Sequence, residues 1–253
     1  MATYLITGGA RGLGLALTKH LVALPASQVS KVIVSVRKPS TDLDLVAKSS
    51  SGRVNVVQFD VANESSIQKA LPAVEAALGG KGLDVLINNA GIAQYAENGT
   101  KSMDTLLESL QVNVLGIHWV TRTFLPLLEK GQLKKVANIS TTLGSIAFAP
   151  TFTWASCPAY KISKAALNSL TVQYSLDHAK DGFTFVAISP GWLKTELGGG
   201  DMADLLPEQG AKGTLEIIGR PNSETNGKFV KVFVEGWDNA DRLHVYDGKE
   251  APW

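Results

Sequence analysis

The sequence is poor in cysteine and has no concentration of charge. Cys157 is the only cysteine among 253 residues, so no disulfide framework within the chain is available, and the four histidines are too scattered to join it in a metal site. The net charge is +1, and no run of Lys or Arg is long enough to neutralise a row of phosphates. We therefore expect neither a metal nor a nucleic-acid partner.

Long hydrophobic segments are absent as well. No stretch of about 20 apolar residues occurs, and the chain does not open with the basic and apolar regions of a secretory signal. These absences predict a cytoplasmic protein without a membrane partner. The composition, with 45% apolar and 19% charged residues, is typical of a globular protein, and we expect a single domain over residues 1–253.

Short runs rich in β-branched and apolar residues alternate with segments whose apolar residues lie three and four apart. The first kind predicts strands over residues 3–7, 31–36, 54–59, 84–87, 135–139, 183–188 and 228–234. The second kind predicts helices, including one from about Met103 and one around 211–218. The alternation predicts a doubly wound α/β domain of the Rossmann type with a parallel sheet of about seven strands. We interpret the glycine triplet at 198–200 as a hinge within this domain.

The first predicted strand ends in a glycine-rich turn, Thr7-Gly8-Gly9-Ala10-Arg11-Gly12-Leu13-Gly14, directly before a helix. Gly8 permits the sharp turn, Gly12 lets the backbone approach phosphates, and Gly14 allows tight packing. The amides and the positive end of the helix dipole would then face a pyrophosphate. The turn predicts a dinucleotide site, and the alternative is an ordinary tight connection between strand and helix.

The second predicted strand ends in Val36-Arg37-Lys38, where an acidic residue would hold the ribose 2′-hydroxyl of NAD. Arg37 and Arg11 are instead suited to a 2′-phosphate, because a guanidinium donates two parallel hydrogen bonds to it. The pair favours NADP(H), and the alternative is that both are solvated surface charges. Asp42 is expected to lie in the following loop.

Tyr160 and Lys164 are four residues apart in a predicted helix, which places both on one face. A phenol is a weak acid at neutral pH, and a neighbouring ammonium lowers its pKa by stabilising the phenolate. The pair therefore predicts a proton-transfer site, although an isolated Tyr-x-x-x-Lys also occurs as an exposed helical pair.

In its ordered motifs the chain resembles the short-chain dehydrogenase/reductase family over nearly its whole length. The motifs are Thr7 to Gly14, Asp60-Val61, Asn88-Asn89-Ala90-Gly91, Asn113, Asn138 to Thr141, Tyr160 to Lys164 and Pro190-Gly191. The stretch 190–199 is similar to the carbonyl reductase, Sniffer and C-factor branch, and Asp247-Gly248 with Pro252-Trp253 is similar to fungal polyketide ketoreductases.

The resemblance implies a catalytic set in which Tyr160 protonates a carbonyl oxygen and Lys164 assists it. Asn113 would hold a proton-relay water. The carbonyl-orienting hydroxyl falls by register to Thr141, with Ser140 as the alternative, because the family has two adjacent serines where this chain has Ser140-Thr141.

The resemblance also implies a cofactor site. Asp60 would bind the adenine amino group, residues 89–91 would follow the adenosine ribose, and Thr195 would bind the nicotinamide carboxamide. The full set is Gly8, Ala10, Arg11, Gly12, Leu13, Gly14, Arg37, Asp60, Val61, Asn89, Ala90, Gly91, Tyr160, Lys164, Pro190, Gly191, Leu193 and Thr195.

These patterns predict an NADPH-dependent reductase of ketones or aldehydes. The alternatives are an NAD-linked alcohol dehydrogenase and a catalytically idle NADP-binding regulator. Aromatic residues at 148, 152 and 154, with Trp192 in an expected lid at 192–212, suit an apolar or aromatic substrate, or else serve only structure. The family often forms homodimers or homotetramers through the helices that contain Asn113 and Tyr160, and the alternative is that the extra segment before Tyr160 blocks this surface. We assign no role to Cys157 and interpret His20, His118, His178 and His244 as structural.

Overall fold

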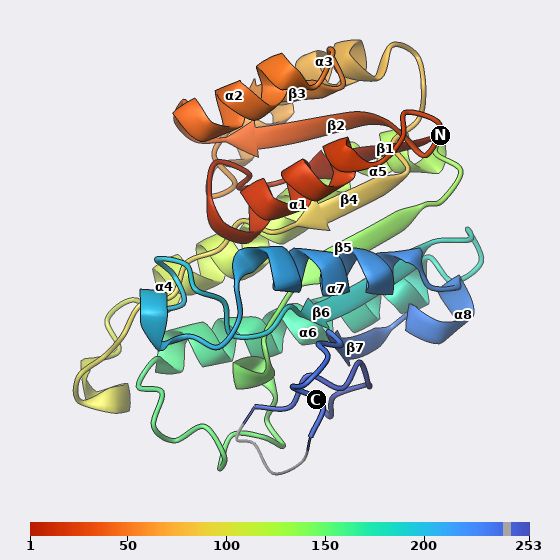
Figure 1. Ribbon diagram of the computed structural model, residues 1–253. Coiled ribbons are helices and arrows are strands. Elements are labelled where there is room, and N and C mark those ends of the chain that lie inside the picture. Colours follow the sequence, from red (N-terminus) through yellow and green to blue (C-terminus); the bar gives the residue numbers. More distant parts are fainter. Residues whose placement is uncertain (240–243) are drawn as a thin grey trace.

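The computed structural model describes residues 1–239 and 244–253, and its centre is a seven-stranded sheet in which all strands are parallel (Figure 1). The strand order is β3-β2-β1-β4-β5-β6-β7. The strands are β1 (Ala2–Ile6), β2 (Val29–Val36), β3 (Val54–Gln58), β4 (Val85–Asn88), β5 (Lys135–Ile139), β6 (Thr184–Ser189) and β7 (Lys228–Lys231). The predicted strands and the doubly wound α/β fold are thus confirmed.

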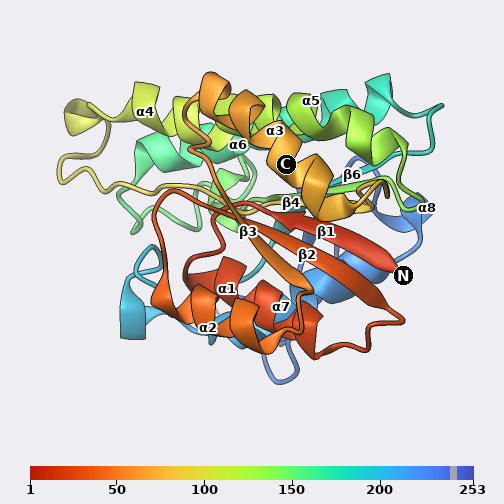
Figure 2. The same cartoon turned by 90° about the horizontal axis from the view of Figure 1, so that it is seen from above.

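Two layers of helices cover the sheet (Figure 2). One face carries α1 (Gly12–Ala23), α2 (Thr41–Ser49) and α7 (Pro207–Gly219), and the other carries α3 (Glu64–Leu78), α4 (Leu106–Leu110), α5 (Gly116–Glu129) and α6 (Pro158–Asp177). The short α8 (Asn222–Thr225) precedes β7. Each face of the sheet has its own apolar core, because strands buried on both sides are apolar throughout.

The chain winds outward from β1 to β3 and then returns to place β4 on the other side of β1. The connections after β1 and β4 therefore leave the sheet in opposite directions. In open parallel sheets such a switch point leaves a crevice at the carboxyl ends of the strands, and ligands bind there. The fold thus places the glycine-rich turn and the residues after β4 beside each other.

Strand β7 ends at Lys231 rather than at Val234 as predicted, and the chain's C-terminal segment pairs along its outer edge and past its end. Antiparallel bridges join Val230 to Glu250 and Phe233 to Asp247. The last residues thereby cover the free edge of β7, which would otherwise expose unpaired backbone groups.

The helix predicted from about Met103 is interrupted. A 3₁₀ turn spans Gly99–Ser102, α4 follows, and a π-helical turn at Gln111–Leu115 leads into α5. Such π-turns occur frequently at functional sites, and this one contains Asn113.

Two smaller expectations also differ from the structure. Asp42 lies in the first turn of α2 rather than in a loop, since Ser40 caps that helix and its hydroxyl accepts the Leu43 amide at 3.4 Å. Helix α7, expected around 211–218, begins earlier, at Pro207, because proline is suited to the first helical position. Within the described residues, no helix is long and apolar enough to cross a membrane.

Candidate active site

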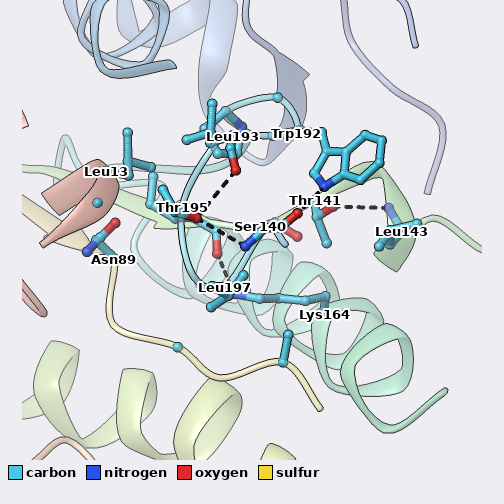
Figure 3. Close-up of a pocket in the computed structure, with 18 of the residues that line it drawn as sticks. Leu13, Asn89, Ser140, Thr141, Leu143, Lys164, Trp192, Leu193, Thr195 and Leu197 are labelled. Carbon is cyan, nitrogen blue, oxygen red and sulfur yellow. Dashed lines mark hydrogen bonds between the residues drawn. The ribbon is translucent and has the colours of Figure 1, made fainter. Parts of the chain in front are cut away.

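A cavity of about 1350 Å³ opens along the carboxyl ends of the strands, and Figure 3 shows part of its wall. Its lining comes from the turns after β1 to β6, the start of α6 and the C-terminal segment. Pockets for single drug-sized ligands measure roughly 300–1,000 Å³. The cavity therefore has room for a dinucleotide together with a second small molecule.

The glycine-rich turn forms one end of this cavity. Gly8 and Gly12 have φ angles of +70° and +53°, in the left-handed region that favours glycine. A Cβ on Gly14 would meet the Gly8 carbonyl oxygen at 2.5 Å. Asn89, after β4, fixes the turn from the other side, since its Nδ2 donates to the carbonyl oxygens of Thr7 at 2.9 Å and Gly8 at 3.1 Å. Side chains at Gly8 and Gly12 would strain the backbone of the turn, and one at Gly14 would displace it.

Two arginines lie along the same end. Arg37 lines the cavity directly after β2, and Arg11 lines it from the turn. In this structure Arg11 forms an exposed ion pair with Glu196. Asp60 also lines the cavity, where its Oδ1 accepts the Ala62 amide at 2.9 Å.

Tyr160 and Lys164 line the cavity from one face of α6. The helix begins at Pro158, which places Tyr160 in the first turn near the positive end of the helix dipole. The Lys164 ammonium is 5.7 Å from the centroid of the Tyr160 ring and donates to the Ile139 carbonyl at 2.6 Å. Both side chains are buried.

The electrostatics of this pair differ from the sequence-based expectation. Burial raises the pKa of Tyr160 above its ordinary value, and Cys157 and Tyr95 add to the rise. Burial also lowers the pKa of Lys164 to about 7. Desolvation disfavours both charged forms and outweighs the stabilisation of phenolate that we expected from Lys164. Tyr160 is therefore a protonated phenol at neutral pH, as a proton donor must be.

Ser140 and Thr141 follow β5 and lie in different surroundings (Figure 3). Ser140 is buried, and its hydroxyl donates to Asn168 Oδ1 at 2.6 Å. The half-buried Thr141 accepts the Leu143 amide at 3.3 Å through its Oγ1, so its own proton remains available. A hydroxyl has a single proton to donate, and only Thr141 retains it for a ligand.

Asn113 lies behind the cavity wall. Its Nδ2 donates to the Ile92 carbonyl and to Ser163 Oγ, both at 2.9 Å, and its Oδ1 accepts the Ile92 amide at 2.9 Å. The side chain thus ties the segment after β4 to α6, close to Lys164. A Cβ on Gly91 would stand 3.1 Å from Asn113 Oδ1 and 3.7 Å from Lys164 Nζ.

The segment after β6 forms the opposite wall. Leu193 pairs with Leu205 in a parallel bridge, which closes the intervening residues into a loop. Within this loop the Thr195 hydroxyl accepts the Gly198 amide at 3.1 Å, and Trp192 Nε1 donates to the Gly198 carbonyl at 2.7 Å (Figure 3). The glycine triplet is folded back on this wall, since a Cβ on Gly198 would lie 2.0 Å from the Leu193 oxygen.

Of the residues predicted for the site, all line the cavity except Gly14 and Asn113. Gly14 is packed under the turn, and Asn113 supports the wall from behind. Sequence reasoning missed Asn168, which holds Ser140 and lies on the same face of α6 as Lys164. The spacing 160, 164 and 168 was the signal that would have found it.

The expected aromatic residues surround the cavity mouth. Phe148, Phe152, Trp154 and Trp192 line it, as does Cys157, whose pKa is raised by burial. Trp154 and Trp192 lie with ring centroids 5.3 Å apart. Within the described residues, no group of three metal-ligating side chains occurs.

The sequence match agrees with this architecture. A family model described as short chain dehydrogenase matches residues 2–205. The chain therefore belongs to the short-chain dehydrogenase family, a family of oxidoreductases.

Three known proteins illustrate the relationship. The short-chain dehydrogenase/reductase AacuF of Aspergillus aculeatus is 38% identical over 200 residues, which cover 76% of this chain and 74% of AacuF. The crystal structure of NADPH-bound carbonyl reductase from chicken fatty liver superposes with a TM-score of 0.85 at 29% identity, covering 100% of this chain and 99% of the other. Carbonyl reductase Sniffer of D. melanogaster gives 0.84 at 29% identity, with all of both chains covered. The expected resemblance to carbonyl reductase and Sniffer is confirmed.

Proposed function

We propose that this protein is an NADPH-dependent reductase that transfers hydride to a ketone or aldehyde, with Tyr160 as the general acid. The observation that carries the proposal is the convergence of Tyr160, Lys164 and Thr141 in one cavity with the glycine-rich turn. A protonated phenol beside a hydroxyl with a free proton is suited to polarising and protonating a carbonyl oxygen.

The residues at the turn fit a dinucleotide. Glycine is required where a Cβ would strike backbone, as at Gly14, and where φ is positive, as at Gly8 and Gly12. Arg11 and Arg37 line the same end and would hold a 2′-phosphate, which supports NADP(H) over NAD(H). The chicken carbonyl reductase, described as NADPH bound, supports the same choice.

When bound, NADPH supplies the hydride. Thr141 donates a hydrogen bond that orients the substrate carbonyl, and Tyr160 transfers its phenolic proton to the carbonyl oxygen as that oxygen gains charge. Lys164 stabilises the phenolate left on Tyr160, helped by the positive end of the α6 dipole. Asn113 joins the segment after β4 to Ser163, the neighbour of Lys164 on α6, through its three hydrogen bonds. Both amide hydrogens of Asn113 are engaged, so a relay water would have to donate to its Oδ1 or bind the backbone at the π-turn.

We further propose that residues 192–212 act as a lid over the substrate within one domain of residues 1–253. The bridge between Leu193 and Leu205 makes the loop a closed unit, and Gly199 and Gly200 in it have positive φ angles, a conformation that favours glycine. The aromatic mouth favours an apolar or aromatic carbonyl compound.

Pairing into a homodimer or homotetramer through the surface of α6 and the turn before α5 is a further part of the proposal. Leu115, Ile162 and Leu176 are exposed on these elements. Light scattering over a range of concentrations tests it, and a mass equal to one chain at all of them would contradict it.

The central test compares wild type with Tyr160→Phe. Wild type should consume NADPH in the presence of ketones or aldehydes, and Tyr160→Phe should lower kcat by about 10²–10⁴ because the acid is lost. NADPH affinity should remain close to wild type, since the ring is retained. No carbonyl-dependent loss of NADPH across a broad panel would refute the reductase and favour a cofactor-binding regulator. Tighter binding of NADH than NADPH, insensitive to Arg37→Ala, would favour an NAD-linked alcohol dehydrogenase.

A further inference from the structure

His244 occupies the centre of an aromatic cluster at the cavity mouth. Its ring stacks on Phe152 at 5.8 Å between centroids and meets Trp192 edge-on at 5.3 Å, while Trp154 and Tyr246 lie at 6.0 and 6.4 Å. These residues come from the loop before α6, the segment after β6 and the C-terminal segment. All five side chains line the same cavity as Tyr160.

A single carboxylate oxygen organises the polar side of this cluster. Asp204 Oδ2 lies 2.7 Å from His244 Nδ1 and accepts the Tyr246 hydroxyl at 2.5 Å. The Tyr246 oxygen in turn accepts the Trp192 backbone amide at 3.2 Å. The side chains of His244 and Asp204 are only 12% and 15% exposed, so the arrangement is largely shielded from water.

The protons of this network can be assigned from the donors and acceptors. Tyr246 has one hydroxyl proton and directs it to Asp204, and burial together with that hydrogen bond raises the pKa of Tyr246. Asp204 Oδ2 therefore acts as an acceptor, so the hydrogen on Nδ1 of His244 points to it. In a neutral imidazole with its proton on Nδ1, Nε2 carries a lone pair and accepts hydrogen bonds.

Nε2 of His244 has no hydrogen-bond partner among the described residues, and it is not among the fully buried polar atoms that lack one. The side chains around it are aromatic and offer an apolar surface. A hydrogen-bond acceptor held in place in an apolar cavity wall is suited to a ligand that combines an aromatic ring system with a hydroxyl group.

We propose that His244 is a substrate-binding residue whose Nε2 accepts a hydrogen bond from a hydroxyl group of an aromatic carbonyl compound. The proposal rests on the proposed function, because it assumes that the carbonyl of the same molecule lies at Tyr160. Asp204 is the positioning residue that fixes the tautomer. The aromatic body packs against Trp154 and Trp192, and the hydroxyl lies at the end of the molecule remote from the reacting carbonyl.

A substrate that lacks the hydroxyl leaves Nε2 desolvated without a partner, which is the situation in which a polar site discriminates most strongly. The bond is remote from the reacting carbon and is equally strong before and during hydride transfer. It therefore lowers KM and leaves kcat nearly unchanged.

The test uses a series of hydroxylated tetralones with the hydroxyl at successive ring positions, each compared with its methyl ether. For at least one ring position, wild type should show a kcat/KM about tenfold higher for the hydroxyl compound, with the difference in KM. His244→Phe keeps the ring and its stacking but removes both nitrogens, and the ratio should fall to about one. Wild type without a preference at any position, or His244→Phe with an unchanged preference, would overturn the proposal.

Asp204→Leu is the second variant, and it leaves the imidazole in place. A leucine offers Nδ1 no acceptor, so the imidazole proton is no longer held on Nδ1 and moves to Nε2, which turns that atom into a donor. The hydroxyl preference should disappear or reverse in favour of the ether, and its persistence would contradict the tautomer assignment. His20→Phe is the matched control, since His20 lies on α1 and does not line the cavity. It should keep the wild-type ratio.

Binding without turnover separates this proposal from the reductase itself. Naphthol and methoxynaphthalene are not reduced, and their binding to the NADPH-loaded protein can be followed by quenching of Trp154 and Trp192 fluorescence. Tighter binding of naphthol that is lost in His244→Phe supports the hydroxyl site even if no carbonyl compound is reduced. Reduction of ketones with equal binding of the two naphthalenes would overturn the hydroxyl site while leaving the reductase intact.

Discussion

The two ends of the cavity are built in different ways. At the cofactor end, the glycine-rich turn is held by backbone contacts and by Asn89, and its shape is set where a Cβ has no room. At the substrate end, Trp154, Trp192 and His244 come from three segments that are far apart in the sequence, and side chains hold them together. The first end tolerates almost no added volume, whereas the second depends on side-chain contacts between distant segments.

The largest predicted effect comes from a substitution that disrupts the cofactor end alone. In Gly14→Ala the new Cβ would stand 2.5 Å from the Gly8 oxygen and 2.7 Å from Asn89 Nδ2, so the turn has to move. We expect NADPH affinity to fall on the order of 100-fold and stability to fall by about 1–3 kcal/mol. Calorimetric titration with NADPH and thermal unfolding measure the two quantities.

Gly219→Ala is the matched control for this change. Gly219 ends α7, and a Cβ there meets nothing within 4 Å. Cofactor affinity and melting temperature should stay at the wild-type level. If both alanine variants bound NADPH equally well, the tight packing at the turn would not be what forms the cofactor end.

The next largest effect distinguishes the role of the Thr141 hydroxyl from that of the Ser140 hydroxyl. Thr141→Ala removes the hydroxyl with a free proton and should lower kcat by about 10- to 100-fold, while Thr141→Ser should retain most activity. Ser140→Ala leaves the Oδ1 of buried Asn168 without its partner, so it should lower the free energy of unfolding by about 1–3 kcal/mol. Its kcat should fall less than that of Thr141→Ala. Steady-state kinetics of the three variants decide it, and a greater loss of kcat in Ser140→Ala would reverse the assignment.

The same contrast explains how far the sequence could predict the molecule. Contiguous motifs encode the turn, the seven strands and the Tyr160–Lys164 pair, because local spacing decides them. The π-turn at Asn113 and the bond between Ser140 and Asn168 depend on contacts between distant segments. His244 was interpreted as structural because nothing near it in sequence marks it, and only the fold brings it beside Asp204.

A pH effect follows from the buried lysine. The pKa of Lys164 is lowered to about 7 by burial, so the ammonium that stabilises the Tyr160 phenolate is lost as the pH rises through that value. Tyr160 itself stays protonated because burial raises its pKa. In the reducing direction kcat/KM should therefore decline above neutral pH, by up to about tenfold per pH unit. A profile that is flat, or that rises from neutral to alkaline pH, would contradict this role of Lys164.

The smallest predicted effect concerns the ion pair that spans the two ends, between Arg11 in the turn and Glu196 in the segment after β6. Both side chains are mostly exposed, at 71% and 74%, so the pair contributes little to stability. A 2′-phosphate would compete with Glu196 for the same guanidinium. Glu196→Gln should therefore raise NADPH affinity about two- to fivefold at low salt, with no change for NADH. Glu216→Gln, which removes a similarly exposed partner of Lys212 on α7, is the control and should change neither affinity. Equal gains for NADPH and NADH would show that Glu196 does not compete with the 2′-phosphate and acts only through the general negative charge at the cavity.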